Sequence, residues 1–302
     1  MKKLVSVIIP TYSRPEFIVR AIESVKNQTY SPIEIIVIDD NGIGTKYQLE
    51  TEQLLNTYII NKEIKYIPHE VNKNGSAARN TGWRASRGSY LLFHDDDDIM
   101  HPQKVEMQVN AIENSDDPLT QAVYCNCSVI RNDKEIRKYH AHKGGNLQYE
   151  LLASQWRFGT GSNIMMTRYA IERLEGYDES FMRHQDLEII VRYFRNFNIT
   201  NIEKDLLFKY EDSKPRIPNM QGLLSIEEHY LDTFKDDILK YPISKQKTLY
   251  YTRYLDLAII AANYNAYSFL IQMIKRASSF KFLSFRDCIR LCKHMILKPQ
   301  KR

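Results

Sequence analysis

The stretch YLLFHDDDDIMHP, residues 90–102, joins a strand signal to a dense acidic cluster. A short apolar run that favours a β-strand is followed at once by four carboxylates, Asp95 to Asp98. Neighbouring like charges repel by roughly 1 kcal/mol at ~4 Å even in water, and by more where protein displaces solvent. Such a cluster is typical either of a solvated acidic loop or of a site that holds a cation. The stretch alone leaves both interpretations open.

Composition places the chain among globular proteins. Its 302 residues are 43% hydrophobic and 26% charged, which fits one large or two modest domains. Residues 1–12 have a basic tip, but their apolar run is too short for a signal peptide and is interpreted as a first strand. The apolar stretch 255–274 is interrupted by polar residues such as Asp256 and Gln272, which favours a buried or amphipathic helix over a membrane span. The cysteine spacings, C-x-C and C-x3-C, match no zinc ribbon or CxxC motif, so free thiols in a reducing cytoplasm are expected.

Charge is unevenly distributed along the chain. The formal net charge is +5, but residues 275–302 carry nine Lys or Arg and one Asp, a net charge of +8. The remainder is therefore about −3, which argues against nucleic acid as a partner. Because Phe280, Leu283 and Ile289 lie among these cations, we expect segment 275–302 to contact an anionic membrane surface peripherally. The rival interpretation is a helix docked on the rest of the protein.

Strand and helix signals alternate over the first hundred residues. The β-branched runs at 4–10 and 33–39 are too apolar to be half-exposed, which is typical of parallel strands covered on both faces. Helix signals fall at 14–28, within 45–60 and at 75–86, and shorter strand signals at 64–68 and 89–94. This βαβαβαβ order predicts an α/β fold with a mostly parallel central sheet flanked by helices.

Polar clusters follow three of the predicted strands. PTYSR (10–14), DDNG (39–42) and the tetra-aspartate each come directly after an apolar run. Ligands bind outside the carboxyl ends of the strands in such sheets, so we expect these clusters to form one crevice. The first turn, TYSRPE, contains no glycine, which argues against a dinucleotide-binding phosphate cradle. Aspartates in its place suggest that a metal ion holds phosphates, because Mg²⁺ takes one or two carboxylates plus phosphate oxygens.

Four segments resemble, in order and spacing, the pattern of glycosyltransferase family 2 on the Rossmann-like GT-A fold. They are VSVIIPTYSRPEFIVRAIESVKNQTY (5–30), IEIIVIDD (33–40), NGSAARNTGWRASRGSYLLFHDDDD (74–98) and GYDESFMRHQDLEIIVRYFRNF (176–197). The resemblance implies a GT-A catalytic domain over residues 1–215, followed by a helical C-terminal region with a basic tail over residues 216–302. It also implies a metal-dependent, inverting transferase that uses a nucleotide-diphosphate sugar.

The resemblance assigns roles to the first two clusters and to Arg79. The first nucleotide-binding segment is matched by Pro10, Thr11, Tyr12 and Arg14. For Tyr12, which would lie near the base, the alternative is a loop aromatic that covers the sheet. Asp39 matches an acid that accepts a hydrogen bond from pyrimidine N3, which favours uracil or thymine, whereas Asp40 is assigned only to capping a turn. Arg79 matches an element near the nucleotide, and bracing of the loops is its alternative role.

Within the tetrad the family's D-x-D pattern corresponds to Asp95 and Asp97. The resemblance implies that Asp95 and Asp97 form the site of Mn²⁺ or Mg²⁺, with Asp97 as the direct ligand, and that Asp96 lies near the ribose. An ion that bridges to the diphosphate would neutralise the carboxylates and stabilise the leaving nucleotide. Asp98 is expected to cap the following helix, whose first turn includes Pro102.

A second carboxylate site lies in HQDLEIIVRYF (184–194), which predicts an amphipathic helix with Asp186 at its beginning. The resemblance implies that Asp186 is the general base; without it, Asp186 would merely complement the helix dipole, worth ~0.3–1 kcal/mol. Glu188 replaces the family's commoner aspartate, so an acceptor contact there is not carried over. Residues 156–168 are expected to contribute to the acceptor wall, and 210–219, with Arg216, to form a loop that closes over the donor.

These features predict a glycosyltransferase that moves a hexose or N-acetylhexosamine from a UDP donor to a glycan or lipid-linked oligosaccharide during surface polysaccharide (capsule) synthesis. The alternative donor is a dTDP sugar, as in a rhamnosyl transferase. A metal-dependent nucleotidyltransferase or phosphohydrolase could use the same aspartates, and a non-catalytic binding subunit is the alternative outside enzymes. We expect the protein in the cytoplasm, with peripheral contact at the inner face of the cell membrane.

Overall fold

The computed structural model describes residues 2–211 and 218–296 of the chain. Contacts divide the chain into two compact units. The first comprises residues 1–147 and 158–212, and the second comprises residues 148–157 and 213–302. The predicted boundary at 215/216 lies near the last division, and residues 148–157 also join the second unit. Arg216 lies outside the described residues.

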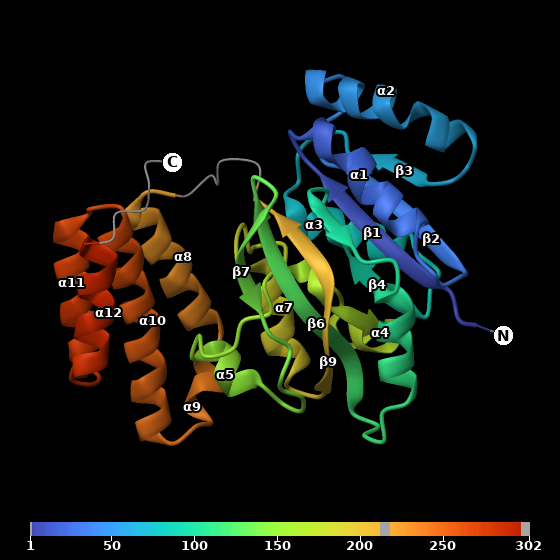
Figure 1. The fold of residues 1–302 in the computed structure, drawn as a ribbon. Coiled ribbons are helices and arrows are strands. Elements are labelled where there is room, and N and C mark those ends of the chain that lie inside the picture. Colours follow the sequence, from blue (N-terminus) through green and yellow to red (C-terminus); the bar gives the residue numbers. More distant parts are fainter. Residues whose placement is uncertain (1, 212–217, 297–302) are drawn as a thin grey trace. The chain divides into compact units, whose positions relative to one another are not determined.

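Four parallel strands form the N-terminal half of the sheet in the order β3-β2-β1-β4 (Figure 1). They are β1 (Val5–Thr11), β2 (Ile33–Asp39), β3 (Lys65–Pro68) and β4 (Tyr90–Phe93). β1 and β4 are buried along almost their whole length, as is the second half of β2, because their side chains are mostly Val, Ile, Leu and Phe. The register pairs Thr11 with Asp39, so β1 and β2 end at the same level. The predicted strands are confirmed.

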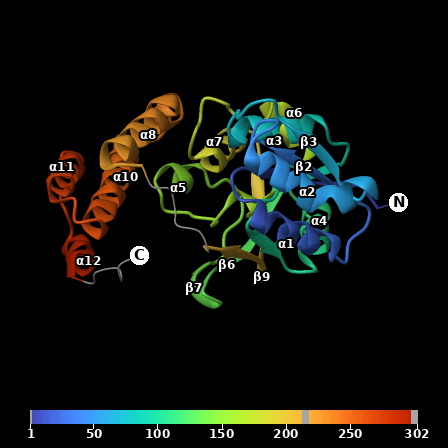
Figure 2. The ribbon, with the colours of Figure 1, turned by 90° about the horizontal axis from the view of Figure 1, so that it is seen from above.

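Helices lie on both faces of this sheet (Figure 2). The first three are α1 (Pro15–Lys26), α2 (Lys46–Ile60) and α3 (Gly75–Arg84). α1 begins at a proline, and α3 begins after Asn74, whose side chain accepts hydrogen bonds from the amides of Ser76 and Ala77. α3 lies so close against β1 that a Cβ on Gly82 would come within 2.2 Å of the Ile8 side chain. These helix starts hold the loops that follow β1 and β3.

The other half of the sheet is mixed. It contains β8 (Met165–Thr167), β6 (Thr120–Arg131), β9 (Asn198–Tyr210) and β5 (Asp98–Met100), in that order, and β7 (Lys134–Tyr139) pairs with β6. β9 runs parallel to β6 and antiparallel to β5, while β8 is antiparallel to β4 and β6. The accompanying helices are α4 (Lys104–Glu113), the short 3-10 helix η1 (Gly161–Asn163), α6 (Arg168–Leu174) and α7 (Gln185–Tyr193). The first unit is therefore an α/β fold, as predicted.

The second unit is helical in the part of the chain that the structure describes. Its helices are α5 (Gln148–Leu152), α8 (Met220–Thr233), α9 (Lys235–Leu239), α10 (Ile243–Asn263), α11 (Tyr267–Ser278) and α12 (Phe285–Ile296). The apolar stretch 255–274 belongs to two of them, because the chain turns at Asn265, whose φ of 55° ends the helical path. Among the described helices, none combines the length and the hydropathy needed to cross a bilayer.

Candidate active site

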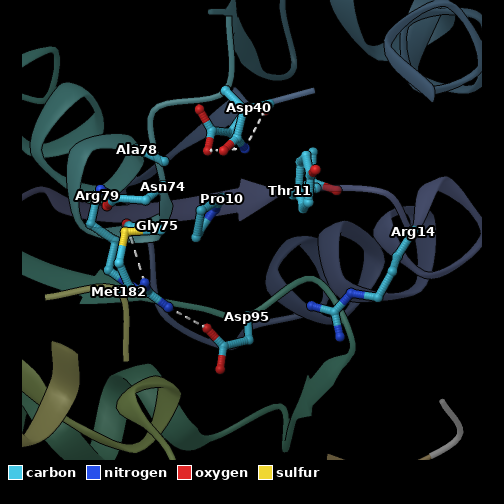
Figure 3. A pocket seen from close by; sticks show the side chains of 12 residues that line it. Pro10, Thr11, Arg14, Asp40, Asn74, Gly75, Ala78, Arg79, Asp95 and Met182 are labelled. Carbon is cyan, nitrogen blue, oxygen red and sulfur yellow. Dashed lines mark hydrogen bonds and ion pairs between the residues drawn. The ribbon is translucent and has the colours of Figure 1, made fainter. Parts of the chain in front are cut away.

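A crevice of about 270 Å³ opens where β1, β2 and β4 end (Figure 3). Of the eight residues predicted to bind the donor, six line it: Pro10, Thr11, Tyr12, Arg14, Arg79 and Asp95. Asp39, Asp96, Asp97 and Asp186 are not part of its lining. All three polar clusters therefore contribute to one crevice, as the sequence predicts. The cluster at 39–42 does so with Asp40, and the tetrad with Asp95.

Arg14 connects the first cluster to the tetrad. It immediately precedes α1, and its guanidinium donates one hydrogen bond to Asp96 Oδ1 at 2.5 Å and another to Asp97 Oδ2. Thr11 Oγ1 donates to the other oxygen of Asp96 at 2.7 Å. The Arg14 side chain remains 35% exposed, so its cation is also accessible to a bound ligand.

Asp96 and Asp97 are costly to keep ionised. Burial raises the pKa of Asp96 to about 7, although Arg14 opposes the shift. Burial also raises the pKa of Asp97; Arg14 lowers this pKa and the charge of Asp95 raises it further. The Asp97 side chain is 18% exposed, whereas that of Asp96 is fully buried. Asp97 is therefore the acid of this pair that a ligand can reach.

The pKa of Asp95 is lowered, in contrast to the raised pKa values of Asp96 and Asp97. Arg79 Nη2 donates to Asp95 Oδ1 at 2.7 Å and Thr160 Oγ1 donates to Asp95 Oδ2 at 2.9 Å, while the Asp95 amide donates to Ser162 Oγ at 2.9 Å. Burial alone would raise the pKa of Asp95, but Arg79, Lys209 and Thr160 outweigh it and lower the pKa to about 2. Asp95 is thus held as a carboxylate mainly by Arg79 of α3, with smaller contributions from Lys209 and Thr160.

The prediction that Asp98 caps the next helix is wrong. Asp98 begins β5, where it pairs with Lys209 of β9, and α4 begins at Lys104 without a side-chain cap. The long-range strand pairing determines the conformation of this residue more strongly than the local helix signal does. Asp98 is 1% exposed, and within the described residues its carboxylate oxygens have no hydrogen bond of good geometry, although Ser162 lies close enough to lower the Asp98 pKa slightly. Burial, followed by the charges of Asp95 and Asp97, raises its pKa well above the usual range.

Lys209 is a site cation that the sequence analysis misses. Its positive charge lowers the pKa values of four carboxyl groups: Asp95, Asp97, Asp98 and Asp186. Burial would lower the pKa of Lys209 itself, but these four charges outweigh burial and raise it. No local pattern marks this residue, because β9 reaches β5 from more than a hundred residues away in the chain.

Asp186 is the second residue of α7, which begins at Gln185. Arg79 Nη1 donates to Gln185 Oε1 at 2.8 Å while Arg79 Nη2 holds Asp95, so one guanidinium joins the tetrad to the start of α7. Burial raises the pKa of Asp186; Arg79 opposes the shift and Asp95 adds to it. A raised pKa makes the ionised carboxylate a stronger proton acceptor.

Glu188 is engaged by the fold. It is 1% exposed, forms a two-contact ion pair with Arg192 and accepts a hydrogen bond from the Asp178 amide at 3.3 Å. Arg192 also donates to the carbonyls of Leu174 at 2.6 Å and Gly176 at 2.7 Å. This network fixes α7 against the end of α6 and thereby supports Asp186.

Asp39 lies behind the crevice lining and Asp40 lies in it, whereas the sequence analysis assigned the ligand contact to Asp39 and only a turn to Asp40. Asp39 is fully buried and accepts hydrogen bonds from Tyr66 Oη at 2.6 Å, the Asn41 amide at 2.9 Å and Asn41 Nδ2 at 2.8 Å. Asp40, assigned only to a turn, lines the crevice. Its carboxylate contacts His69 Nδ1 at 2.7 Å and accepts from Asn72 Nδ2 at 2.8 Å and the Lys73 amide at 2.8 Å. Asp40 therefore secures the loop that precedes α3.

The residues after β4 fit a hard divalent ion. Carboxylate oxygens suit Mg²⁺ and Mn²⁺. Asp97 is partly accessible, and the two buried oxygens of Asp98 have no hydrogen bond of good geometry from the described chain. Within residues 2–211 and 218–296, no three His, Cys, Asp or Glu side chains form a metal cage by themselves.

Several crevice residues were missed by the sequence analysis: Asn72, Asn74, Gly75, Ala78 and Met182. Asn74 and Gly75 could have been found from the sequence, because an Asn-Gly pair stands where α3 begins. A Cβ on Gly75 would lie 2.8 Å from Gln185 Oε1 and 2.9 Å from Arg79 Nη1, so glycine at this position makes room for the bond that joins them. Met182, 68% exposed, carries no such signal.

Comparison with known proteins identifies the family. The profile described as Glycosyl transferase family 2 matches residues 6–175, which is more than half of the chain. The chain belongs to this family. It is therefore a glycosyltransferase, and the matched range contains the crevice and the tetrad but ends before Asp186.

Curated relatives of this glycosyltransferase carry the same assignment. An uncharacterized glycosyltransferase of Methanocaldococcus jannaschii is 29% identical over 228 residues, 74% of each chain. The amylovoran biosynthesis glycosyltransferase AmsB of Erwinia amylovora is 25% identical over 193 residues, 62% of each chain. An uncharacterized glycosyltransferase of Rickettsia bellii is 29% identical over 75% of this chain, but the match spans 31% of that protein.

Solved structures show that this glycosyltransferase has the GT-A fold. S. aureus TarS 1–349 in complex with UDP-GlcNAc has a TM-score of 0.57 at 14% identity, covering 96% of this chain and 90% of that one. The mannosyltransferase PcManGT of Pyrobaculum calidifontis, in complex with GDP-Man and Mn²⁺, has a TM-score of 0.57 at 17% identity, covering 96% and 78%. At these identities the likeness establishes the fold alone.

Proposed function

We propose that the crevice binds a nucleotide-diphosphate sugar together with a divalent metal ion and transfers the sugar, with inversion, to an acceptor hydroxyl. The observation that carries this proposal is the double contact of Arg79. Its guanidinium holds Asp95 of the tetrad at 2.7 Å and Gln185, the neighbour of Asp186, at 2.8 Å. An acid of the D-x-D pattern that lines the crevice is thereby linked to the residue next to the candidate base.

The donor would lie along the ends of β1, β2 and β4. Tyr12 is 45% exposed beside the crevice and is available to contact a base, and Arg14 offers a cation to the diphosphate. Asp97 would hold Mn²⁺ or Mg²⁺, with Asp95 and Asp96 beside it. When bound, the ion would neutralise charge on the diphosphate and stabilise the departing nucleotide.

The donor nucleotide is proposed to be UDP, carrying a hexose or an N-acetylhexosamine. The resemblance at Asp39 supports a pyrimidine, because a carboxylate can accept the N3–H of uracil or thymine, and TarS is described in complex with UDP-GlcNAc. Asp39 is buried behind the crevice lining, so the base would have to reach the lone pair of Oδ2 that Tyr66 leaves open. A dTDP sugar satisfies the same hydrogen bond and stays the alternative donor. PcManGT, described with GDP-Man, shows that the fold also accommodates a purine donor.

Asp186 would act as the general base. Its carboxylate would accept the proton of the acceptor hydroxyl as the acceptor oxygen forms a bond to the anomeric carbon. The bond between that carbon and the diphosphate oxygen breaks in the same displacement, and the nucleoside diphosphate leaves on the opposite side of the sugar. Arg79 and Arg14, which line the crevice, would stabilise the negative charge that develops on the leaving diphosphate, and Lys209 would add positive charge near the tetrad.

The acceptor is proposed to be a glycan or lipid-linked oligosaccharide of a surface polysaccharide. The amylovoran biosynthesis protein AmsB is a relative with a named pathway, and it supports this class of product. An acceptor carried on a lipid would place the enzyme in the cytoplasm, at the inner face of the cell membrane.

The test is to supply a panel of nucleotide sugars with Mn²⁺, with and without lipid-linked oligosaccharides extracted from the host envelope. We expect one donor to be consumed much faster when acceptor is present, with the product sugar in the opposite anomeric configuration by NMR. Asp133→Asn, an Asp-to-Asn change in an exposed turn, is the matched control for Asp186→Asn. Donor hydrolysis at the same rate with and without acceptor would indicate a phosphohydrolase. No consumption of any donor would indicate a binding subunit.

A further inference from the structure

Helix α12 is anchored along one side only in the described part of the second unit. Leu291 is 5% exposed and packs in the apolar core with residues of α10 and α11. Asp287 accepts a hydrogen bond from Tyr251 Oη at 2.5 Å, and His294 Nδ1 lies 2.9 Å from Asn263 Oδ1. These three residues recur at positions four and three apart, so they share one face of the helix.

The opposite side of α12 is unusually apolar for a solvent-facing surface. Phe285 is 82% exposed and Ile289 is 53% exposed, and Phe282, in the turn just before the helix, is 92% exposed. Cys288 and Cys292 are exposed on the same side. At 100° per residue, Phe285, Cys292 and Ile289 lie within about 60° of one another and face away from Leu291.

Cations border this apolar stripe. Arg286 and Lys293 are exposed and follow the stripe around the helix, and Arg290 lies beyond them, 3.4 Å from Asp256. The acid of α12, Asp287, is turned inward. The solvent side of the helix therefore has an apolar half and a basic half, the pattern of a helix that lies in a membrane interface.

The sequence analysis placed the apolar contact on other residues. Phe280 stacks on Tyr250 at 4.9 Å and on Tyr254 at 6.0 Å, and Leu283 packs partly against the core of the second unit. Of the three residues named there, Ile289 faces solvent. The structure moves the exposed aromatic surface to Phe282 and Phe285.

We propose that this surface, the α12 face (Phe282, Phe285, Arg286, Ile289 and Lys293), binds an anionic lipid bilayer. Its charge selects the occupant, because anionic headgroups would neutralise Arg286 and Lys293 while the two phenyl rings enter the headgroup layer. A second copy of this chain would bring the same cations against one another. The inference rests on the proposed function for the place of action, but lipid binding itself requires no catalytic step.

The test is co-sedimentation of the full chain with vesicles of phosphatidylcholine alone or with one-third phosphatidylglycerol. We expect binding to the anionic vesicles, weakened by salt and absent from the neutral ones. Phe282→Ser with Phe285→Ser, and separately Arg286→Glu with Lys293→Glu, should each reduce binding at least about tenfold, since each cation near such a surface contributes about fivefold. The matched controls are Leu239→Ser with Ile243→Ser, two exposed apolar residues of the same unit, and Lys247→Glu.

Two further readouts keep the result interpretable. Unchanged melting temperatures show that the variants fold, and transfer to a soluble acceptor should stay at the wild-type rate in both double variants. Absence of transfer by the wild type would be a failure of the proposed function, separate from lipid binding. Equal binding to neutral vesicles, or full binding by both double variants, would overturn the proposal. So would a wild-type dimer in solution that the phenylalanine changes convert to a monomer without affecting vesicle binding.

Discussion

Arg79 forms an ion pair of 2.7 Å with Asp95, and both groups lie at the crevice. The other end of the same guanidinium reaches Gln185, so the contact couples the tetrad to α7. The planar fork of arginine makes this possible, since a lysine ammonium is a single point charge on a flexible stem. The pair is therefore expected to position Asp186 relative to the donor.

Replacing Arg79 by lysine tests this coupling. Arg79→Lys keeps the charge but cannot hold Asp95 and Gln185 in the same way, so kcat should fall by about 10-fold to 100-fold, the typical effect of misplacing a catalytic group by about 1 Å. Steady-state kinetics and a melting curve measure this. Arg84→Lys, on the exposed part of the same helix, is the control. An unchanged kcat in Arg79→Lys would show that only the positive charge at this position matters, and would contradict the coupling.

Asp39 is predicted to recognise the base. Asp39→Asn should weaken binding of uridine or thymidine diphosphate, because an amide can present a donor to N3–H where an acceptor is needed. Tyr66→Phe removes one of the hydrogen bonds to Asp39 while keeping its carboxylate, and serves as the control for a purely structural effect. Isothermal titration with the free nucleotides measures both. Equal losses in the two variants, or none in Asp39→Asn, would assign Asp39 to the fold.

Lys104 gives a pH-dependent prediction away from the crevice lining. Burial lowers the pKa of this fully buried lysine to about 8, whereas in the unfolded chain it is near 10.4. Below pH 8 the fold carries a buried ammonium at full cost, and the cost disappears as pH rises from about 8 to 10.4. Lys104→Met should thus be more stable than wild type at pH 7 by roughly 1–3 kcal/mol, with the gain shrinking by pH 10. Urea unfolding at both pH values checks this, and a gain that does not change with pH would refute it.

Asp186 is predicted to accept the proton of the acceptor hydroxyl. General-base catalysis contributes about 10²–10⁴-fold, so Asp186→Asn should lose that much in kcat while donor affinity stays near wild type. Single-turnover transfer and donor titration separate the two quantities. Weakened donor binding with kcat preserved would assign Asp186 to binding, and the inverting displacement would then need another base.

The parts of this fold that local sequence determines were predictable. β1, β2 and β4 are mostly apolar runs, and polar residues at their ends could be placed at one crevice because parallel strands end on the same side. Contacts between distant segments were not predictable. Local sequence predicted a helix cap at Asp98, but pairing with β9 places this residue in a strand. The same pairing brings Lys209 next to the tetrad.

The roles of the two arginines show the same limit. Arg14 and Arg79 were predicted to lie near a nucleotide, which stays a prediction. Their protein partners could not be predicted, because these lie up to 106 residues away in the chain: Asp96, Asp97, Asp95 and Gln185. No periodicity or spacing encodes such contacts. Likewise, the split of 255–274 into two helices depends on the left-handed conformation of Asn265, which an apolar run does not reveal.

The central claim is that the crevice binds a nucleotide sugar through a metal held by Asp97. It is tested most directly by melting curves with a panel of UDP, dTDP and GDP sugars, with Mn²⁺ or with excess chelator, for wild type and Asp97→Asn. A ligand that binds the native state stabilises it by about 2.7 kcal/mol at a hundredfold excess over Kd. The account predicts that one nucleotide sugar raises the melting temperature of wild type in Mn²⁺, and that chelator or Asp97→Asn abolishes the rise. An equal rise in chelator, or in Asp97→Asn, would contradict it.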